Sequence, residues 1–167
     1  MSKSPTDILK EAILLEKRGK AFYSNVAEQS KSQAAKKIFT MMAEEEDEHI
    51  KFLSRQFKAY AQDKKFVKPD EHIEDPNEET VVRILSEDIK KEISAASFEA
   101  AAISAAMDFE TRAVKIYSER AEEATDPMEK ETYKMLAEWE SGHHKLLHRL
   151  NEDLKEQVWN DNNFWPF

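Results

Sequence analysis

The sequence predicts an all-α protein, a four-helix bundle in which two antiparallel helix hairpins are joined by a long crossover. The 167 residues include only 2 glycines and 5 prolines, so few positions favour a sharp turn and long helices are expected. Apolar residues recur at steps of three and four, which is the period of helices with one buried face. A chain of this length can bury one core, so residues 1–167 are expected to form one domain.

The first helix is expected from about residue 5 to about residue 29. Ser4-Pro5 has the pattern of an N-cap followed by proline at the first helical position. The apolar stripe of this helix consists of Ile8, Ala12, Leu15, Gly19, Phe22 and Val26. A second helix is predicted to begin near Ser32, and the short connection makes the two helices antiparallel. Its stripe consists of Ala35, Phe39, Met42, Glu46, His49, Leu53, Gln56 and Tyr60.

Residues 65–96 are expected to form the crossover. The first part is polar and contains Pro69, and Asp75-Pro76-Asn77-Glu78 combines an N-cap residue, a proline and an acidic third position. This signal predicts a short helix at about residues 81–93.

The second hairpin is expected to follow the crossover. An alanine-rich helix is predicted at about residues 97–124, and the capping signal recurs at Asp126-Pro127-Met128-Glu129. The stripe of the last helix consists of Tyr133, Leu136, Glu140, His143, Leu147, Leu150 and Leu154. The tail, about residues 159–167, contains Trp165 and Phe167, which we expect to pack on the bundle or on a partner subunit.

Several classes of function are excluded by composition. The chain has no cysteine, which excludes disulfides, zinc knuckles, iron–sulfur clusters and thiol catalysis. A formal net charge of −9 argues against nonspecific binding of nucleic acid, which requires clustered lysine and arginine. No apolar run approaches the length of a membrane span and no signal-peptide pattern is present, so a cytoplasmic protein is expected. The acidity is explained either by solubility or by buried carboxylates that bind cations.

An internal repeat relates the two hairpins. A shift of 94 residues (110 − 16 = 94) carries Tyr23-Ser24 onto Tyr117-Ser118. The same shift superposes Glu16 on Glu110, Glu46 on Glu140, His49 on His143 and Leu53 on Leu147. Most of the matched positions are core-type residues, as a duplicated hairpin requires, and the glutamates and histidines are the exceptions.

These exceptions predict a dinuclear metal site. A buried, unpaired carboxylate costs several kcal/mol, and four that face one another require positive charge, which two divalent cations supply. Residues i and i+3 point the same way on a helix, so each Glu-x-x-His offers a carboxylate and an imidazole to one ion. Such donors suit iron or manganese. The predicted ligands are Glu16, Glu46, His49, Glu110, Glu140 and His143.

Nearby glutamates, tyrosines and glycines are not predicted to be metal ligands. Glu44, Glu45 and Glu48 are expected on the solvated surface. Tyr23 and Tyr117 are expected to line the core beside the site, with a hydrogen-bonding or redox role as the alternative. The two glycines, Gly19 and Gly142, each cost about 1 kcal/mol within a helix, and the hypothesis is that they leave room near the site for close packing or for a small ligand.

Four segments carry a family resemblance: Leu15-Glu16 with Phe22-Tyr23, residues 42–49, Phe109-Glu110 with Ile116-Tyr117, and residues 136–143. They resemble the rubrerythrin branch of the ferritin-like superfamily over roughly residues 5–155. The resemblance implies two iron ions, with manganese or zinc as other metals that the site accepts. It also implies a non-haem centre that reduces hydrogen peroxide, and a homodimer. Glu16 and Glu110 correspond to the family's single glutamates, and the two Glu-x-x-His pairs to its paired ligands.

The chain departs from that family in two ways. Rubrerythrins usually carry a four-cysteine rubredoxin-like domain, so here the electrons are expected from a separate donor protein. Ala113 stands where rubrerythrins carry an extra glutamate, so the six-ligand set resembles the ferroxidase centre of bacterioferritins. The enzyme is therefore expected to reduce hydrogen peroxide or dioxygen. The alternatives are a ferroxidase or iron-binding protein without sustained turnover, and an interaction module with a vestigial site.

Overall fold

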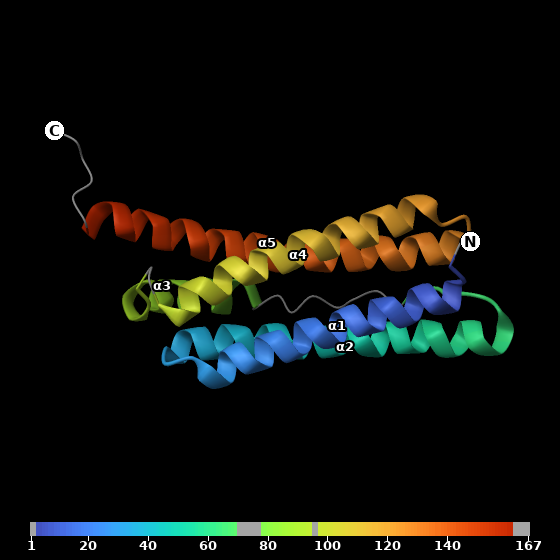
Figure 1. Cartoon of the computed structure of the whole chain (residues 1–167), viewed down its shortest axis with the longest axis horizontal. Coiled ribbons are helices and arrows are strands. Elements are labelled where there is room, and N and C mark those ends of the chain that lie inside the picture. The colour runs from blue at the N-terminus through green and yellow to red at the C-terminus, as the bar shows by residue number, and fades with distance from the viewer. Residues whose placement is uncertain (1–2, 70–77, 95–96, 162–167) are drawn as a thin grey trace.

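The computed structural model describes residues 3–69, 78–94 and 97–161. Within these residues the helices are α1 (Pro5–Gln29), α2 (Gln33–Asp63), α3 (Glu78–Glu92), α4 (Phe98–Glu123) and α5 (Pro127–Asp161). Helix α1 packs along α2 and α4 packs along α5, and the two hairpins lie face to face (Figure 1). The predicted all-α bundle with a long crossover is confirmed. None of the helices in the described ranges is both long and apolar enough to cross a membrane.

The helices begin where the sequence predicts capping residues. Side-chain oxygens of Ser4, Ser32 and Ser97 accept hydrogen bonds from the backbone N–H groups three residues later. The carboxylate of Asp126 accepts from the backbone N–H groups two and three residues later, at 2.7 and 3.1 Å. These bonds satisfy donors that would otherwise be unpaired in the first turn of each helix. The capping signal at Asp75 and the tail residues Trp165 and Phe167 lie outside the described residues.

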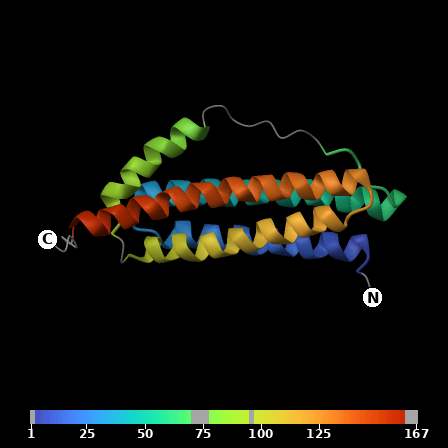
Figure 2. The same cartoon turned by 90° about the horizontal axis from the view of Figure 1, so that it is seen from above.

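The crossover helix α3 closes one end of the bundle. It lies obliquely to the four long helices (Figure 2) and contacts α2 and α5. Ile89 is buried there, as is Ile93 just beyond the helix. The carboxylate of Glu92, at the end of α3, accepts a hydrogen bond from the hydroxyl of Ser32 and another from Ala34 N at 3.1 Å. The crossover therefore holds the start of α2 as well as covering the core.

The buried face of α1 is rotated slightly from the predicted apolar stripe, so that at several positions the residue next to the predicted one is the more buried. On α1 the fully buried positions include Leu9 and Tyr23, whereas Leu15 and Phe22 are only half-buried. Both sets are apolar and both follow the helical period, so periodicity alone does not define the centre of the buried face. The rotation of α1 directs Glu16 into the bundle.

The core consists of two apolar clusters. Phe39 and Leu147 belong to the cluster near α3, and Leu53 and Leu136 belong to the cluster at the opposite end. Between these clusters lies a layer of buried glutamates and histidines from all four long helices: Glu16, Glu46, His49, Glu110, Glu140 and His143. The bundle therefore surrounds one polar layer with apolar side chains on both sides.

Candidate metal centre

The polar layer contains all six residues that the sequence proposes as metal ligands. None of them is more than 6% exposed. They come from α1, α2, α4 and α5, so the layer exists only because both hairpins are packed together. The helical spacing predicts that the glutamate and histidine of each pair face the same way, and the structure places both in the interior.

The donors form two groups that share two members. In the first group, Glu16, Glu46, His49 and Glu140 each offer one atom, and these atoms lie within 4.8 Å of one another. In the second group, Glu46, Glu110, Glu140 and His143 do the same. We call these groups the His49 subsite and the His143 subsite. Glu46 and Glu140 belong to both, one from each hairpin.

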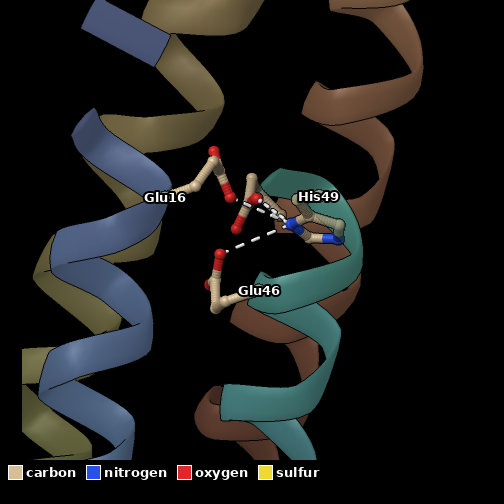
Figure 3. Close-up of side chains that lie close together, drawn as sticks. Glu16, Glu46 and His49 are labelled. Carbon is tan, nitrogen blue, oxygen red and sulfur yellow. Dashed lines mark hydrogen bonds and ion pairs between the residues drawn. The ribbon is translucent and has the colours of Figure 1, made fainter. Parts of the chain in front are cut away.

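The His49 subsite converges on one imidazole nitrogen. The Nδ1 atom of His49 lies 2.9 Å from Glu140 Oε1, 3.0 Å from Glu16 Oε2 and 3.4 Å from Glu46 Oε2. Figure 3 shows the carboxylates of Glu16 and Glu46 directed towards this ring from different helices. The three oxygens thus surround the face that the histidine presents to the interior.

The His143 subsite repeats this arrangement with slightly longer separations. The Nδ1 atom of His143 lies 3.3 Å from Glu110 Oε1, 3.4 Å from Glu140 Oε2 and 3.5 Å from Glu46 Oε1. The two imidazole rings lie 5.5 Å apart between centroids. Two cations bound beside these Nδ1 atoms would have Glu46 and Glu140 as common ligands.

The donor set fits a pair of divalent cations. Both carboxylate oxygens of Glu46 and of Glu140, and Nδ1 of His143, are buried without a well-aligned hydrogen bond among the described residues, although the oxygens lie 2.9–3.5 Å from histidine Nδ1 atoms. Buried polar atoms are normally hydrogen-bonded, so this concentration of unsatisfied atoms needs an explanation. Four carboxylates and two neutral imidazoles carry a charge of −4, which two divalent ions neutralise. Carboxylate and imidazole donors suit first-row metals such as iron and manganese.

Protons occupy this site when metal does not. Burial alone would lower the pKa of His49 and of His143, but the surrounding carboxylates outweigh it and raise both pKa values well above the usual range. This shift favours the imidazolium form of both rings at neutral pH. Burial also acts to raise the pKa of Glu46 and of Glu140, but the two imidazolium groups at 2.9–3.5 Å outweigh it and lower both pKa values.

The remaining two glutamates have raised pKa values. Burial and repulsion from Glu140 raise the pKa of Glu16 well above its ordinary value. Burial raises the pKa of Glu110 to about 8. Without metal, these shifts favour protonated imidazoles beside the Glu46 and Glu140 carboxylates and favour the neutral forms of Glu16 and Glu110.

Two tyrosines connect the hairpins beside the site. The hydroxyl of Tyr23 on α1 donates to Glu110 on α4, and the hydroxyl of Tyr117 on α4 donates to Glu16 on α1. Both rings are fully buried. Burial and the neighbouring carboxylates raise the pKa of each tyrosine, so the hydroxyls remain donors at neutral pH. Each tyrosine therefore fixes the orientation of the glutamate that belongs to only one subsite.

The expectation that Glu45 is a surface residue is wrong. Its side chain is only 28% exposed, and its Oε2 lies 2.6 Å from Nε2 of His143. On the other hairpin, the ring of Trp139 stacks on the ring of His49, with centroids 5.0 Å apart and an interplanar angle of 12°. The internal repeat relates these two residues (45 + 94 = 139), and each directly precedes a shared glutamate. The repeat marks Glu45 and Trp139 as equivalent positions, but it does not indicate which side chain either one contacts.

The two glycines have different surroundings. A Cβ atom at Gly19 would lie 3.1 Å from the Phe109 ring and 3.2 Å from the carboxyl carbon of Glu46. Gly19 thus permits a close approach beside the site. At Gly142 nothing lies within 4 Å, and the position is exposed, so the hypothesis that Gly142 leaves room at the site is wrong.

Replacing Gly19 and Gly142 with alanine is expected to affect stability and metal binding differently at the two positions. Gly142→Ala should raise the free energy of unfolding by about 1 kcal/mol, because alanine is the better helix former and no neighbour obstructs it. Gly19→Ala should gain less, because Phe109 and Glu46 must shift, and it should weaken metal binding through Glu46. Urea unfolding and metal titration of both variants test this. Equal stabilisation with unchanged metal affinity would contradict it.

Comparison with known proteins gives one match. A family model described as Rubrerythrin matches residues 7–151 of the 167-residue chain. This span contains both Glu-x-x-His pairs, both single glutamates and both tyrosines. Neither the curated proteins nor the solved structures give a match.

Proposed function

Because the chain belongs to the rubrerythrin family, whose shared domain is the ferritin-like di-iron domain, we propose that it is an oxidoreductase that reduces hydrogen peroxide at two iron ions. The proposed ligands are Glu16, Glu46, His49, Glu110, Glu140 and His143. The observation that carries the proposal is the pair of buried donor groups that share Glu46 and Glu140. A centre of this kind holds two metal ions close enough to act on one small molecule.

The chemistry needs two electrons for each peroxide molecule. When bound, the two iron ions supply one electron each, and reduction of hydrogen peroxide to two water molecules also consumes two protons. The protein keeps Glu16 and Glu110 oriented through the hydroxyls of Tyr117 and Tyr23. The apolar clusters on both sides of the layer limit access by bulk water, which favours a small uncharged oxidant.

A ferroxidase is the second candidate, and one position favours it. Ala113 is buried on α4, one turn beyond Glu110, where rubrerythrins place an extra glutamate. The donor set is therefore more nearly symmetric, with one glutamate and one histidine specific to each subsite. Under this alternative the protein oxidises ferrous ions with dioxygen and binds the product without sustained turnover.

The test compares the two oxidants on protein loaded anaerobically with ferrous iron. Oxidation is followed by stopped-flow absorption after mixing with hydrogen peroxide or with dioxygen. We expect peroxide to react at least about tenfold faster than dioxygen, and the Glu16→Gln/Glu110→Gln variant to lose at least about a hundredfold in the peroxide rate, in line with the loss of positioned ligands. Glu44→Gln/Glu48→Gln, at two exposed positions of α2, is the matched control.

Two outcomes would reject the peroxidase proposal. Wild-type protein that reacts no faster than the Glu16→Gln/Glu110→Gln variant would show that the proposed ligands have no part in the reaction. A faster reaction with dioxygen than with peroxide would favour the ferroxidase.

The proposal extends to partners and location, with the family resemblance as its support. Because these 167 residues contain no cysteine, the electrons would come from a centre outside them, and we propose a donor protein. We further propose that residues 1–167 act as one domain, that two copies form a homodimer, and that the protein works in the cytoplasm without binding nucleic acid or membranes.

A further inference from the structure

The two subsites differ at one pair of repeat-related positions, and this difference has consequences for metal binding. Glu45 on α2 contacts the histidine of α5, and Trp139 on α5 contacts the histidine of α2. The contacts therefore cross between the hairpins in both directions. The six proposed ligands are identical between the two halves of the repeat. Positions 45 and 139 are not, because one carries a carboxylate and the other an indole.

The Glu45 carboxylate lies against the outward-facing nitrogen of the His143 ring. Nε2 of His143 lies 2.6 Å from the Glu45 carboxylate, while Nδ1 faces the three interior carboxylates. A neutral imidazole that donates Nε2–H to Glu45 presents the lone pair of Nδ1 to a cation. Carboxylate partners of this kind fix the tautomer of a metal-binding histidine and increase its basicity.

Trp139 acts on His49 in a different way. Its ring lies nearly parallel to the imidazole and also contacts the Phe52 ring edge-on, with centroids 5.0 Å apart in each case. This packing restricts the orientation of His49 but adds no formal charge. The His143 subsite thus has four carboxylates nearby, those of Glu46, Glu110, Glu140 and Glu45, whereas the His49 subsite has three.

We propose that Glu45 is a positioning residue that makes the two subsites unequal, so that the His143 subsite binds the first divalent cation and the His49 subsite binds the second. The inference rests on the proposed metal centre and is independent of the reaction. The additional carboxylate strengthens attraction for a cation, and the fixed tautomer removes a rearrangement that would otherwise accompany binding. Partners of this kind change metal affinity by about 10- to 100-fold.

The test is an anaerobic titration of metal-free protein with Co²⁺, followed by calorimetry and by visible absorption. Co²⁺ reports its ligand geometry in the spectrum, so the titration needs no turnover. We expect two steps for the wild-type chain, with dissociation constants about 10- to 100-fold apart. Glu45→Gln, which can still accept the hydrogen bond but lacks the charge, should weaken the first step and bring the two steps together. Glu45→Ala should weaken the first step further.

Matched variants separate this role from general charge and folding. Glu44→Gln removes the same charge from an exposed neighbouring position and should leave both steps unchanged. Glu45→Asp should restore part of the first step. Trp139→Glu places a carboxylate at the repeat-related position, and thermal unfolding shows whether that variant is folded. If it is, its second step should become tighter.

The outcomes distinguish this inference from the metal centre itself. Equal binding of two ions by the wild-type chain, or a first step that Glu45→Gln leaves unchanged, would overturn the inference while the metal centre stands. An equal loss in Glu44→Gln would also overturn it, because the effect would then be one of net charge. No binding to the wild-type chain would overturn the metal centre and the inference together.

Discussion

Replacing Glu140 with glutamine is expected to abolish the binding of both cations, whereas replacing Glu110 should abolish the binding of one. Glu140 lies in both donor groups, with Oε1 2.9 Å from Nδ1 of His49 and Oε2 3.4 Å from Nδ1 of His143. Glutamine preserves the shape and removes the negative charge that both subsites share. Glu110 belongs to the His143 subsite alone. Metal content should therefore fall from about two ions per chain to about none in Glu140→Gln and to about one in Glu110→Gln.

Metal analysis after dialysis measures this directly, and circular dichroism establishes that each variant is folded. Glu138→Gln, at an exposed position on the same helix, is the control for lost charge. The shared role of Glu140 would be refuted by a Glu140→Gln protein that retains one tightly bound ion. Glu46→Gln provides a second test from the other hairpin, because Glu46 is also common to both groups.

Acidification is expected to weaken metal binding steeply, by about a hundredfold per ion for each pH unit below about pH 7. The pKa values of His49, His143 and Glu16 are raised well above their ordinary values, and that of Glu110 is raised to about 8. We therefore expect the metal-free site to hold four protons at pH 7, one on each of these groups. Two divalent ions displace all four, about two per ion. Calorimetry in buffers of different ionisation enthalpy counts the protons released.

The same groups determine how the stability of the metal-free protein varies with pH. Their folded-state pKa values exceed the unfolded values of 4.5 for glutamate and 6.5 for histidine, so the folded protein retains protons that the unfolded chain loses. Between about pH 6.5 and 8 each such group should lower the free energy of unfolding by up to about 1.4 kcal/mol per pH unit. The shifts of Glu46 and Glu140 have the opposite sign, and their contribution is lost only as pH falls below about 4.5.

Urea unfolding at pH 6, 7 and 8 tests this dependence in metal-free and metal-loaded protein. The metal-free protein should become less stable as pH rises, and the loaded protein should become more stable. Glu110→Gln should bind only one ion, at the His49 subsite, and should therefore reduce the proton release to about two. Release of one proton or fewer by the wild-type chain would contradict the protonation states assigned to the site.

Much of the fold and of the candidate site follows from the spacing of residues. Capping residues such as Ser32 and Asp126 mark helix starts, and the repeat of 94 residues brings Glu16 and Glu110 to equivalent positions. These signals are local, or relate two identical local patterns, so they do not depend on how the helices pack. The same signals predict the six proposed ligands.

The features that the sequence did not reveal depend on how helices are rotated and which distant segments meet. Glu45 lies within an acidic run, and only the packing of α2 against α5 brings it to His143 instead of to solvent. The support of Ser32 by Glu92 joins residues 60 positions apart. No periodic pattern records such a contact, because each side chain alone is typical of an exposed helix.

The shared glutamates bear on the ancestry of the chain. The His49 subsite takes Glu140 from the second hairpin, and the His143 subsite takes Glu46 from the first. A single hairpin carries one glutamate on its first helix and one Glu-x-x-His on its second. It therefore supplies only three of the four ligands of one subsite. If the repeat arose by gene duplication, a single ancestral hairpin would have completed a centre only by associating with an identical copy about a twofold axis. In such an association every substitution affects both copies, because one gene encodes them. In a fused chain each hairpin can change separately, which allows Glu45 and Trp139 to differ.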